Sequence, residues 1–150
     1  MAVWSTSAGA AIVALGVLFA PAEQTKPSAV FVVMVNIANP VRTLPLADLR
    51  RIFMKQMRMW PHGESIVPVD WDATSPVRES FSQQVLARSV REMADYWVQQ
   101  AVTQGLTPPS TQRSSRALLR FVGSVAGAIA YVPPGEADDT VAVIKITGLP

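Results

Sequence analysis

The sequence predicts a single α/β domain in which a layered sheet is flanked by helices. Short apolar runs rich in β-branched residues alternate along the chain with segments whose apolar residues recur at helical spacing. This is the pattern of strands alternating with amphipathic helices. The length of 150 residues corresponds to about one domain. Hydrophobic residues make up 49% of the chain and charged residues 16%, a balance that favours a packed core over disorder.

Residues 1–22 are predicted to be a signal peptide. This segment carries no charged side chain, and residues 8–20 form a continuous run of 13 small and apolar residues. Such a run suits the core of a signal peptide and is short for a membrane span, which needs about 20 apolar residues. Ala20-Pro21-Ala22 matches the A-x-A cleavage pattern, so residues 23–150 are expected to form the domain. An uncleaved membrane anchor and a buried N-terminal helix are the alternatives.

Export predicts a periplasmic or secreted protein that meets a membrane only through its signal segment.

The composition excludes several kinds of site. No cysteine is present, which removes disulfides, thiolate catalysis and cysteine-bound metals. The single histidine, His62, lies in a Pro/Gly turn, and no serine lies in a nucleophile-elbow pattern, so we expect no enzyme activity, cofactor or metal. The net charge is only +2, and the arginines fall at helical spacings typical of solvated faces, so no nucleic-acid partner is expected.

The first predicted strand covers residues 30–35, a β-branched run suited to a strand buried on both faces. Residues 36–45 hold two prolines and two asparagines and are predicted to be a loop. In the helix that follows, apolar residues recur at helical spacing: Leu46, Leu49, Ile52 and Phe53. Residues 60–63 form a turn, and residues 66–69 form a second short strand.

Two helices are predicted next. Thr74 or Ser75 caps the first, with Pro76 at its first position. Its inner stripe is formed by Phe81, Val85 and Leu86. Ser89 and Glu92 have the spacing of a capping box, which opens the second helix. The residues of that helix expected to face inward are Met93, Tyr96, Trp97 and Ala101.

The last part of the chain continues the alternation. Residues 105–110 form a Gly/Pro loop, and Ser114 or Ser115 starts a further helix. Its inward residues are Leu118, Leu119 and Val122. Residues 128–132 and 141–146 are predicted to be strands.

A candidate anion site lies at the start of the helix that Ser75 opens. The N–H groups and the dipole of a helix N-terminus favour anions. The hydroxyls of Thr74 and Ser75 and the N–H groups of Val77 and Arg78 would point at one spot, and the Arg78 side chain adds positive charge. The alternative is an ordinary cap, in which the two hydroxyls satisfy the helix's own backbone.

The residues just before this helix suggest two further interpretations. Asp70 and Asp72 could hold a cation, but they provide few of the six to eight oxygens that calcium takes. Trp71 lies between them in a predicted loop and is the candidate recognition residue for a ligand or a protein partner. Trp97, at helical spacing, is expected in the core.

Several motifs follow one another in a specific order. After residues 35–40 come the Leu46-to-Phe53 helix, the turn Trp60-Pro61-x-Gly63, the strand Ile66-x-Pro68-Val69 and finally Gly127-Ala128-Ile129-Ala130-Tyr131-Val132. Over about residues 30–132, this order resembles the phosphate-type (PstS-like) substrate-binding proteins of ABC uptake transporters. The resemblance implies a short, single-lobe member with one lobe of a type II periplasmic-binding-protein-like fold.

The resemblance implies that the protein is an exported solute-binding protein whose ligand is a small oxyanion such as phosphate. The candidate ligand-binding residues are Asp70, Trp71, Thr74, Ser75, Val77 and Arg78. Two family motifs are altered: Lys55-Gln56 replaces a Gly-Lys pair, and residues 70–76 replace an arginine and a Gly-Ser-Gly-Thr loop. The alternative function is therefore an interaction module of the cell envelope that has lost anion binding. A single lobe also leaves its ligand face uncovered, which favours a protein partner or self-association.

N-terminal sequencing of the exported protein tests the signal peptide. We expect the mature chain to begin at Glu23, because the cleavage pattern ends at Ala22. A mature chain that begins at Met1 would show that the segment is retained.

Overall fold

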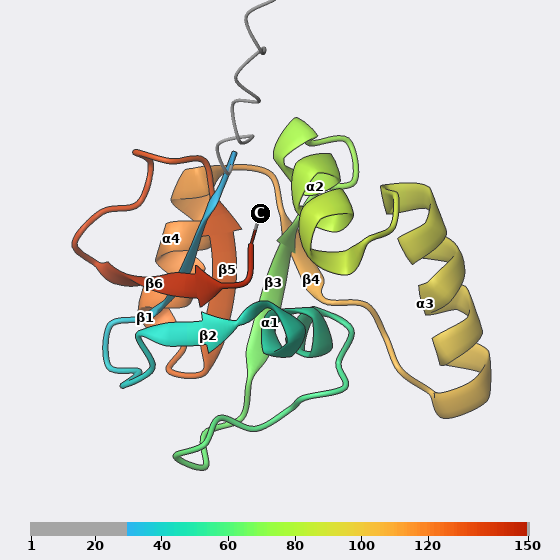
Figure 1. Cartoon of the computed structure of the whole chain (residues 1–150), viewed down its shortest axis with the longest axis horizontal. Helices are drawn as coiled ribbons and strands as arrows, with labels where there is room; N and C mark the ends of the chain where they lie inside the picture. Colours follow the sequence, from blue (N-terminus) through green and yellow to red (C-terminus); the bar gives the residue numbers. More distant parts are fainter. Residues whose placement is uncertain (1–29, 150) are drawn as a thin grey trace, which may run out of the picture.

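A six-stranded mixed sheet organises residues 30–149, which are the residues that the computed structural model describes (Figure 1). The predicted signal peptide lies outside them. The strands are β1 (Val32–Asn36), β2 (Thr43–Pro45), β3 (Val67–Trp71), β4 (Ser110–Gln112), β5 (Ala128–Val132) and β6 (Val141–Thr147). Their order across the sheet is β2-β6-β1-β5-β3-β4. β1 runs antiparallel to both of its neighbours, β3 is parallel to β5 and β4, and β2 is parallel to β6.

Helices cover both faces of this sheet. They are α1 (Leu46–Phe53), α2 (Pro76–Phe81), α3 (Val90–Gln104) and α4 (Ser115–Ser124), and a π-helical turn, η1 (Ser82–Leu86), continues α2. Asn36 in β1 donates to Val122 O of α4 at 2.8 Å. Tyr131 in β5 pairs with Val33, three positions from Asn36, so it points to the opposite face, where it contacts rings from α1 and α2. α3 lies at the periphery beyond α2 (Figure 1).

The caps of the two long helices agree with the sequence. Glu92 N–H donates to Ser89 Oγ at 3.1 Å and Ser89 N–H donates to Glu92 Oε2 at 2.7 Å, which is the predicted capping box of α3. Ser114 caps α4, because Ala117 N–H donates to its Oγ at 3.2 Å. Within residues 30–149, no helix is both long and apolar enough to cross a membrane.

Two predicted loops contain short strands. β2 lies within residues 36–45, and β4 begins at the end of residues 105–110. Each has three residues and lies at an edge of the sheet, which is too short for a strand pattern to appear in the sequence. Ala101 was also predicted to face inward, and it is exposed. The reason is that α3 buries only Met93 and Trp97 and stands at the side of the domain.

A buried aromatic cluster joins α1 and α2 to the sheet. Tyr131 lies at its centre and contacts three other rings. Its ring stacks on that of Phe81 with centroids 3.8 Å apart, and it meets Phe31 and Phe53 edge-on. All four side chains are at most 2% exposed. Aromatic pairs of this kind add about 0.5–1.5 kcal/mol each beyond the burial of their area.

Lys55 follows α1 in a left-handed conformation, with φ of 55°. The resemblance places a glycine at this position. Side chains with a Cβ adopt this conformation only at a cost, whereas glycine adopts it freely. The backbone therefore keeps the turn that a glycine would favour, although the residue has changed.

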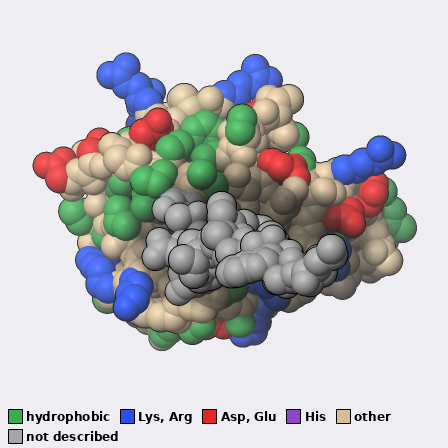
Figure 2. Space-filling model, turned by 45° about the horizontal axis from the view of Figure 1, so that its top comes forward, with side chains coloured by type: hydrophobic (Ala, Val, Ile, Leu, Met, Phe, Trp, Pro, Cys, Tyr) green, Lys and Arg blue, Asp and Glu red, His purple; other side chains and the backbone are tan. Residues whose placement is uncertain are grey.

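On the face shown in Figure 2, Lys and Arg side chains lie in several separate places. Arg50 is partly buried, and its Nε donates to Val85 O at 2.7 Å.

Gly127 is required by a close approach of two backbone segments. A Cβ at this position would lie 1.7 Å from Ser65 O. The indole N–H of Trp60, which is 2% exposed, donates to Gly127 O at 3.1 Å. This hydrogen bond holds the turn at residues 60–63 against Gly127, the residue before β5.

We expect Gly127→Ala to lower the free energy of unfolding by about 3 kcal/mol, because the backbone at Ser65 has to move. Gly123→Ala in α4 is the control, since its Cβ would meet only Thr140 O, at 3.8 Å. That change is expected to be neutral or to stabilise by up to about 1 kcal/mol. Urea denaturation measures both variants, and equal stabilities would contradict this account of Gly127.

Candidate functional site

The candidate site lies at the sheet edge where β3 and β4 end. The two strands are parallel neighbours with Trp71 opposite Gln112, so the chain leaves both on the same side. Asp72 N–H donates to Gln112 O at 2.9 Å and continues the pairing past the end of β3. Residues 72–75 then lead into α2, and residues 113–114 lead into α4. Both helices therefore begin at this edge.

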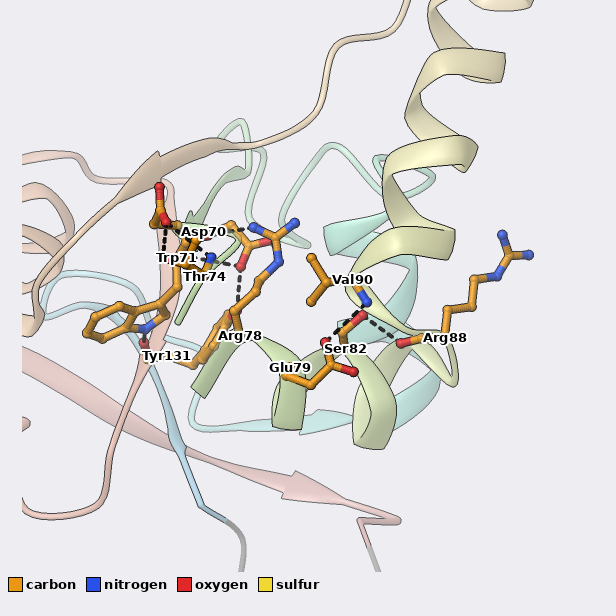
Figure 3. Close-up of polar contacts among 10 residues, drawn as sticks. Asp70, Trp71, Thr74, Arg78, Glu79, Ser82, Arg88, Val90 and Tyr131 are labelled. Carbon is orange, nitrogen blue, oxygen red and sulfur yellow. Dashed lines mark hydrogen bonds and ion pairs between the residues drawn. The ribbon is translucent and has the colours of Figure 1, made fainter. Parts of the chain in front are cut away.

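Asp70 is a buried carboxylate rather than a loop residue. Its Oδ1 accepts hydrogen bonds from the Tyr131 hydroxyl and, at 2.8 Å, from Trp71 N–H. Arg78 Nε lies 3.3 Å from its Oδ2 (Figure 3). Burial raises the pKa of Asp70 above its ordinary value, and the charge of Arg78 and the two hydrogen bonds oppose this shift. Burial and the adjacent Asp70 charge also raise the pKa of Tyr131 well above its usual range.

This pairing removes Asp70 from the cation interpretation considered for Asp70 and Asp72. Its carboxylate is already neutralised by Arg78 within the fold. Among the described residues, no three His, Cys, Asp or Glu side chains are grouped so that they could hold a metal ion.

Arg78 faces inward to the protein's own acceptors. Its side chain is only 11% exposed, and its guanidinium donates to Trp71 O as well as pairing with Asp70. Its backbone N–H donates to Ser75 O at 3.0 Å. The backbone N–H groups of Val77 and Arg78 were predicted to bind an anion. That of Arg78 is already used in this hydrogen bond, and that of Val77 is not part of it. The positive charge predicted to attract an anion is thus largely used inside the domain.

Asp72 occupies donors that an anion would otherwise use. Its Oδ1 accepts from Thr74 N–H at 3.1 Å and from Thr74 Oγ1 at 2.6 Å. Its Oδ2 lies 3.7 Å from Arg113 Nε. The hydrogen bonds from Thr74, and then the charges of Arg113 and Arg78, lower the pKa of Asp72 below its ordinary value. The carboxylate is therefore ionised at neutral pH.

The predicted hydroxyl cap of α2 is wrong. Ser75 is the residue before the helix, but its side chain accepts no hydrogen bond from the helix backbone. Thr74 donates to Asp72 instead. Pro76 does occupy the first helical position, as predicted.

Trp71 was predicted to lie in a loop, and this is wrong. It is the last residue of β3, is 8% exposed, and its indole N–H donates to Tyr131 O at 2.7 Å. β3 extends two residues past the predicted strand end because Val69, Asp70 and Trp71 pair with β4. That neighbour was itself missing from the prediction.

Sequence reasoning also missed two members of this edge. Tyr131 was recognised only as part of a strand motif, yet its hydroxyl meets Asp70 across 61 positions of sequence. Arg113 was assigned to a solvated helix face, and it lies instead just after β4, beside Asp72. The signal for both was available only once β3, β4 and β5 were known to be adjacent.

Solved structures of phosphate receptors share this fold. An ABC-type phosphate transport receptor from Vibrio cholerae matches with a TM-score of 0.64 and 21% identity, over 80% of this chain and 47% of that protein. A putative phosphate ABC transporter substrate-binding protein with bound phosphate from Clostridium perfringens matches with a TM-score of 0.62 and 22% identity, over 80% and 46%. PstS from Borrelia burgdorferi matches with a TM-score of 0.63 and 11% identity, over 81% and 48%.

The chain thus spans about half the length of the receptors it matches. At these identities the likeness concerns the fold, and it confirms the predicted resemblance and the predicted single-lobe α/β architecture at that level. No protein-family model and no curated protein sequence matches the chain.

We expect Arg78→Ala to lower the free energy of unfolding by about 3 kcal/mol at neutral pH, because it leaves Asp70 buried without a counter-charge. The folded-state pKa of Asp70 is already raised above 3.8 and should rise further in this variant. A carboxyl with a raised folded pKa destabilises the protein fully above that pKa, and the effect is lost progressively as the pH falls from there to the ordinary value of 3.8. The loss caused by Arg78→Ala should therefore shrink as the pH falls toward 3.8.

Urea denaturation at neutral pH and near pH 5 measures this dependence on the Asp70 charge. Arg50→Ala is the control, since Arg50 donates to a backbone carbonyl and not to a carboxylate. Its effect on stability should not change between the two pH values. An Arg78→Ala effect that is equally independent of pH would contradict the role assigned to Asp70.

Proposed function

We propose that the protein is an exported solute-binding lobe of the kind used by ABC uptake transporters. The observation that carries this proposal is the match of 80% of the chain to about half of several phosphate receptors. Those similar structures are transport receptors rather than enzymes. The predicted signal peptide supports a periplasmic or secreted location.

The solute is proposed to meet the edge formed by the starts of α2 and α4. Thr74, Ser75 and Val77 lie at the start of α2, and Arg113 lies just before α4. The side chain of Arg113 is 90% exposed, so it can reach a ligand without disturbing the core. A small oxyanion is the ligand class, since helix starts and an arginine favour negative charge.

Asp72 sets how strongly such an oxyanion binds. Its carboxylate accepts both Thr74 donors and lies near Arg113, so it acts as an anion supplied by the chain itself. A phosphate would have to approach this like charge, which costs about 1 kcal/mol at 4 Å even in water and more where water is excluded. We therefore propose that phosphate and sulfate bind only weakly to the unmodified protein.

The uncovered edge also supports a role for a partner. A pocket normally buries most of a small ligand's surface, and this chain spans about half of the receptors it matches. A second protein of the envelope or a second copy of the chain is proposed to cover the edge. The alternative function, an interaction module without a solute, would leave both anions unbound in every variant.

We expect Asp72→Asn to strengthen phosphate binding roughly tenfold, because it removes the like charge and keeps an oxygen for Thr74. Isothermal titration of phosphate and of sulfate at low salt measures the change. Asp48→Asn removes a carboxylate from α1, which is paired with Arg51 outside this edge, and should leave binding unchanged. Arg113→Ala in the Asp72→Asn background should abolish the gain. No binding of either anion by Asp72→Asn would contradict an oxyanion site at this edge.

A further inference from the structure

A groove of about 520 Å³ opens between α3 and the same sheet edge. One wall is a face of α3, and the facing wall comes from the segment that returns to β4. The residues of these walls that matter here are Val90, Ala94, Trp97, Val98, Pro108 and Pro109. Asp72, Arg78 and Thr111 form its polar end. The volume lies within the range of roughly 300–1,000 Å³ that small-molecule sites occupy.

The apolar wall follows from how α3 is attached. Val90, Ala94 and Val98 are spaced four residues apart and share one face of the helix. α3 uses a neighbouring face, with Met93 and Trp97, to pack on the domain. Much of the first face is left uncovered, because Ala94 is exposed and Val98 is 68% exposed. An apolar face beside a polar end is suited to a ligand that has both characters.

The polar end holds one carboxylate, Asp72, that has no buried counter-charge. Asp72 and Arg78 are the charged residues that line the groove, and Asp70 lies directly behind Arg78. The charge of Arg78 is therefore balanced by Asp70 and is not available to Asp72. Arg113 lies 3.7 Å from Asp72, but its side chain is 90% exposed, so solvent and salt screen its charge. A cationic group is the better complement to Asp72 at this end.

The geometry points to a site for a small organic amine with an apolar body in this groove. The ammonium group lies at the Asp72 carboxylate, and the body lies along the α3 face over Trp97. This assignment rests on the proposed solute-binding function and adds a second solute class, of opposite charge to the oxyanion, in the groove beside the same edge. It reverses the sign of charge that the similar phosphate receptors accept.

Three probes with the same phenyl body separate charge from apolar burial: phenethylamine, phenethyl alcohol and hydrocinnamate. We expect the amine to bind most tightly and the carboxylate most weakly. Isothermal titration measures the affinities, and the chemical shift of the Trp97 indole N–H reports whether the groove is occupied. Equal affinities for the three probes, or no shift of Trp97 with the amine, would overturn the inference.

Asp72→Asn should weaken amine binding roughly two- to fivefold, as expected for a partly exposed ion pair, while it strengthens phosphate binding. Ala94→Phe fills the groove from an exposed helical position and should abolish amine binding. Val102→Phe is the matched control, because Val102 is 83% exposed on the same helix and does not line the groove. Equal amine binding by the two phenylalanine variants would overturn the assignment.

The two proposals fail in different ways. If Asp72→Asn gains phosphate but the unmodified protein shows no preference for the amine, the solute-binding function stands and the amine site falls. If the amine binds as expected and Asp72→Asn gains no anion, the groove stands and the oxyanion site falls. If neither ligand binds any variant, both proposals fall.

Discussion

The buried carboxylate of Asp70 is the interaction on which this edge of the domain depends. It joins β5 through the Tyr131 hydroxyl and α2 through Arg78. A carboxylate loses several kcal/mol of hydration when it is buried, and the loss is tolerable only where its oxygens find donors and a counter-charge. Here each oxygen has at least one such partner. Because Asp70 lies in β3 and its partners Tyr131 and Arg78 lie in β5 and α2, the ion pair also fixes where α2 starts relative to the sheet.

The same arrangement pairs several cationic and donor groups of this edge with the protein's own carboxylates. In an anion site, the helix starts and arginines remain available to the ligand. In this protein Asp70 pairs with Arg78, and Asp72 accepts hydrogen bonds from both donors of Thr74. The domain therefore uses several of these cationic and donor groups in its own interactions. A shared fold with phosphate receptors is thus compatible with a different preference at the surface where those groups would act.

Most of the fold could be predicted from the sequence, but little of the candidate site could. β5 and the capped helices α3 and α4 were predictable because apolar period, cap residues and breakers lie close together in the chain. β2 and β4 were not, since three polar or mixed residues at a sheet edge leave no periodic signal. The error at Trp71 followed directly, because the end of β3 is defined by pairing with β4. The hydrogen bond between Tyr131 and Asp70 joins positions 61 residues apart. A local sequence pattern could therefore not predict it.

The two short edge strands have a consequence for how copies of this domain can meet. An open sheet exposes unpaired N–H and C=O groups at its edges, and long flat edges recruit further strands. Here β2 ends in Pro45, which has no N–H, and β4 follows directly after Pro108-Pro109. A strand arriving at either edge of the described sheet would find only three residues to pair with. Amyloid-like stacking and continuation of the sheet between molecules through these two edges are therefore disfavoured.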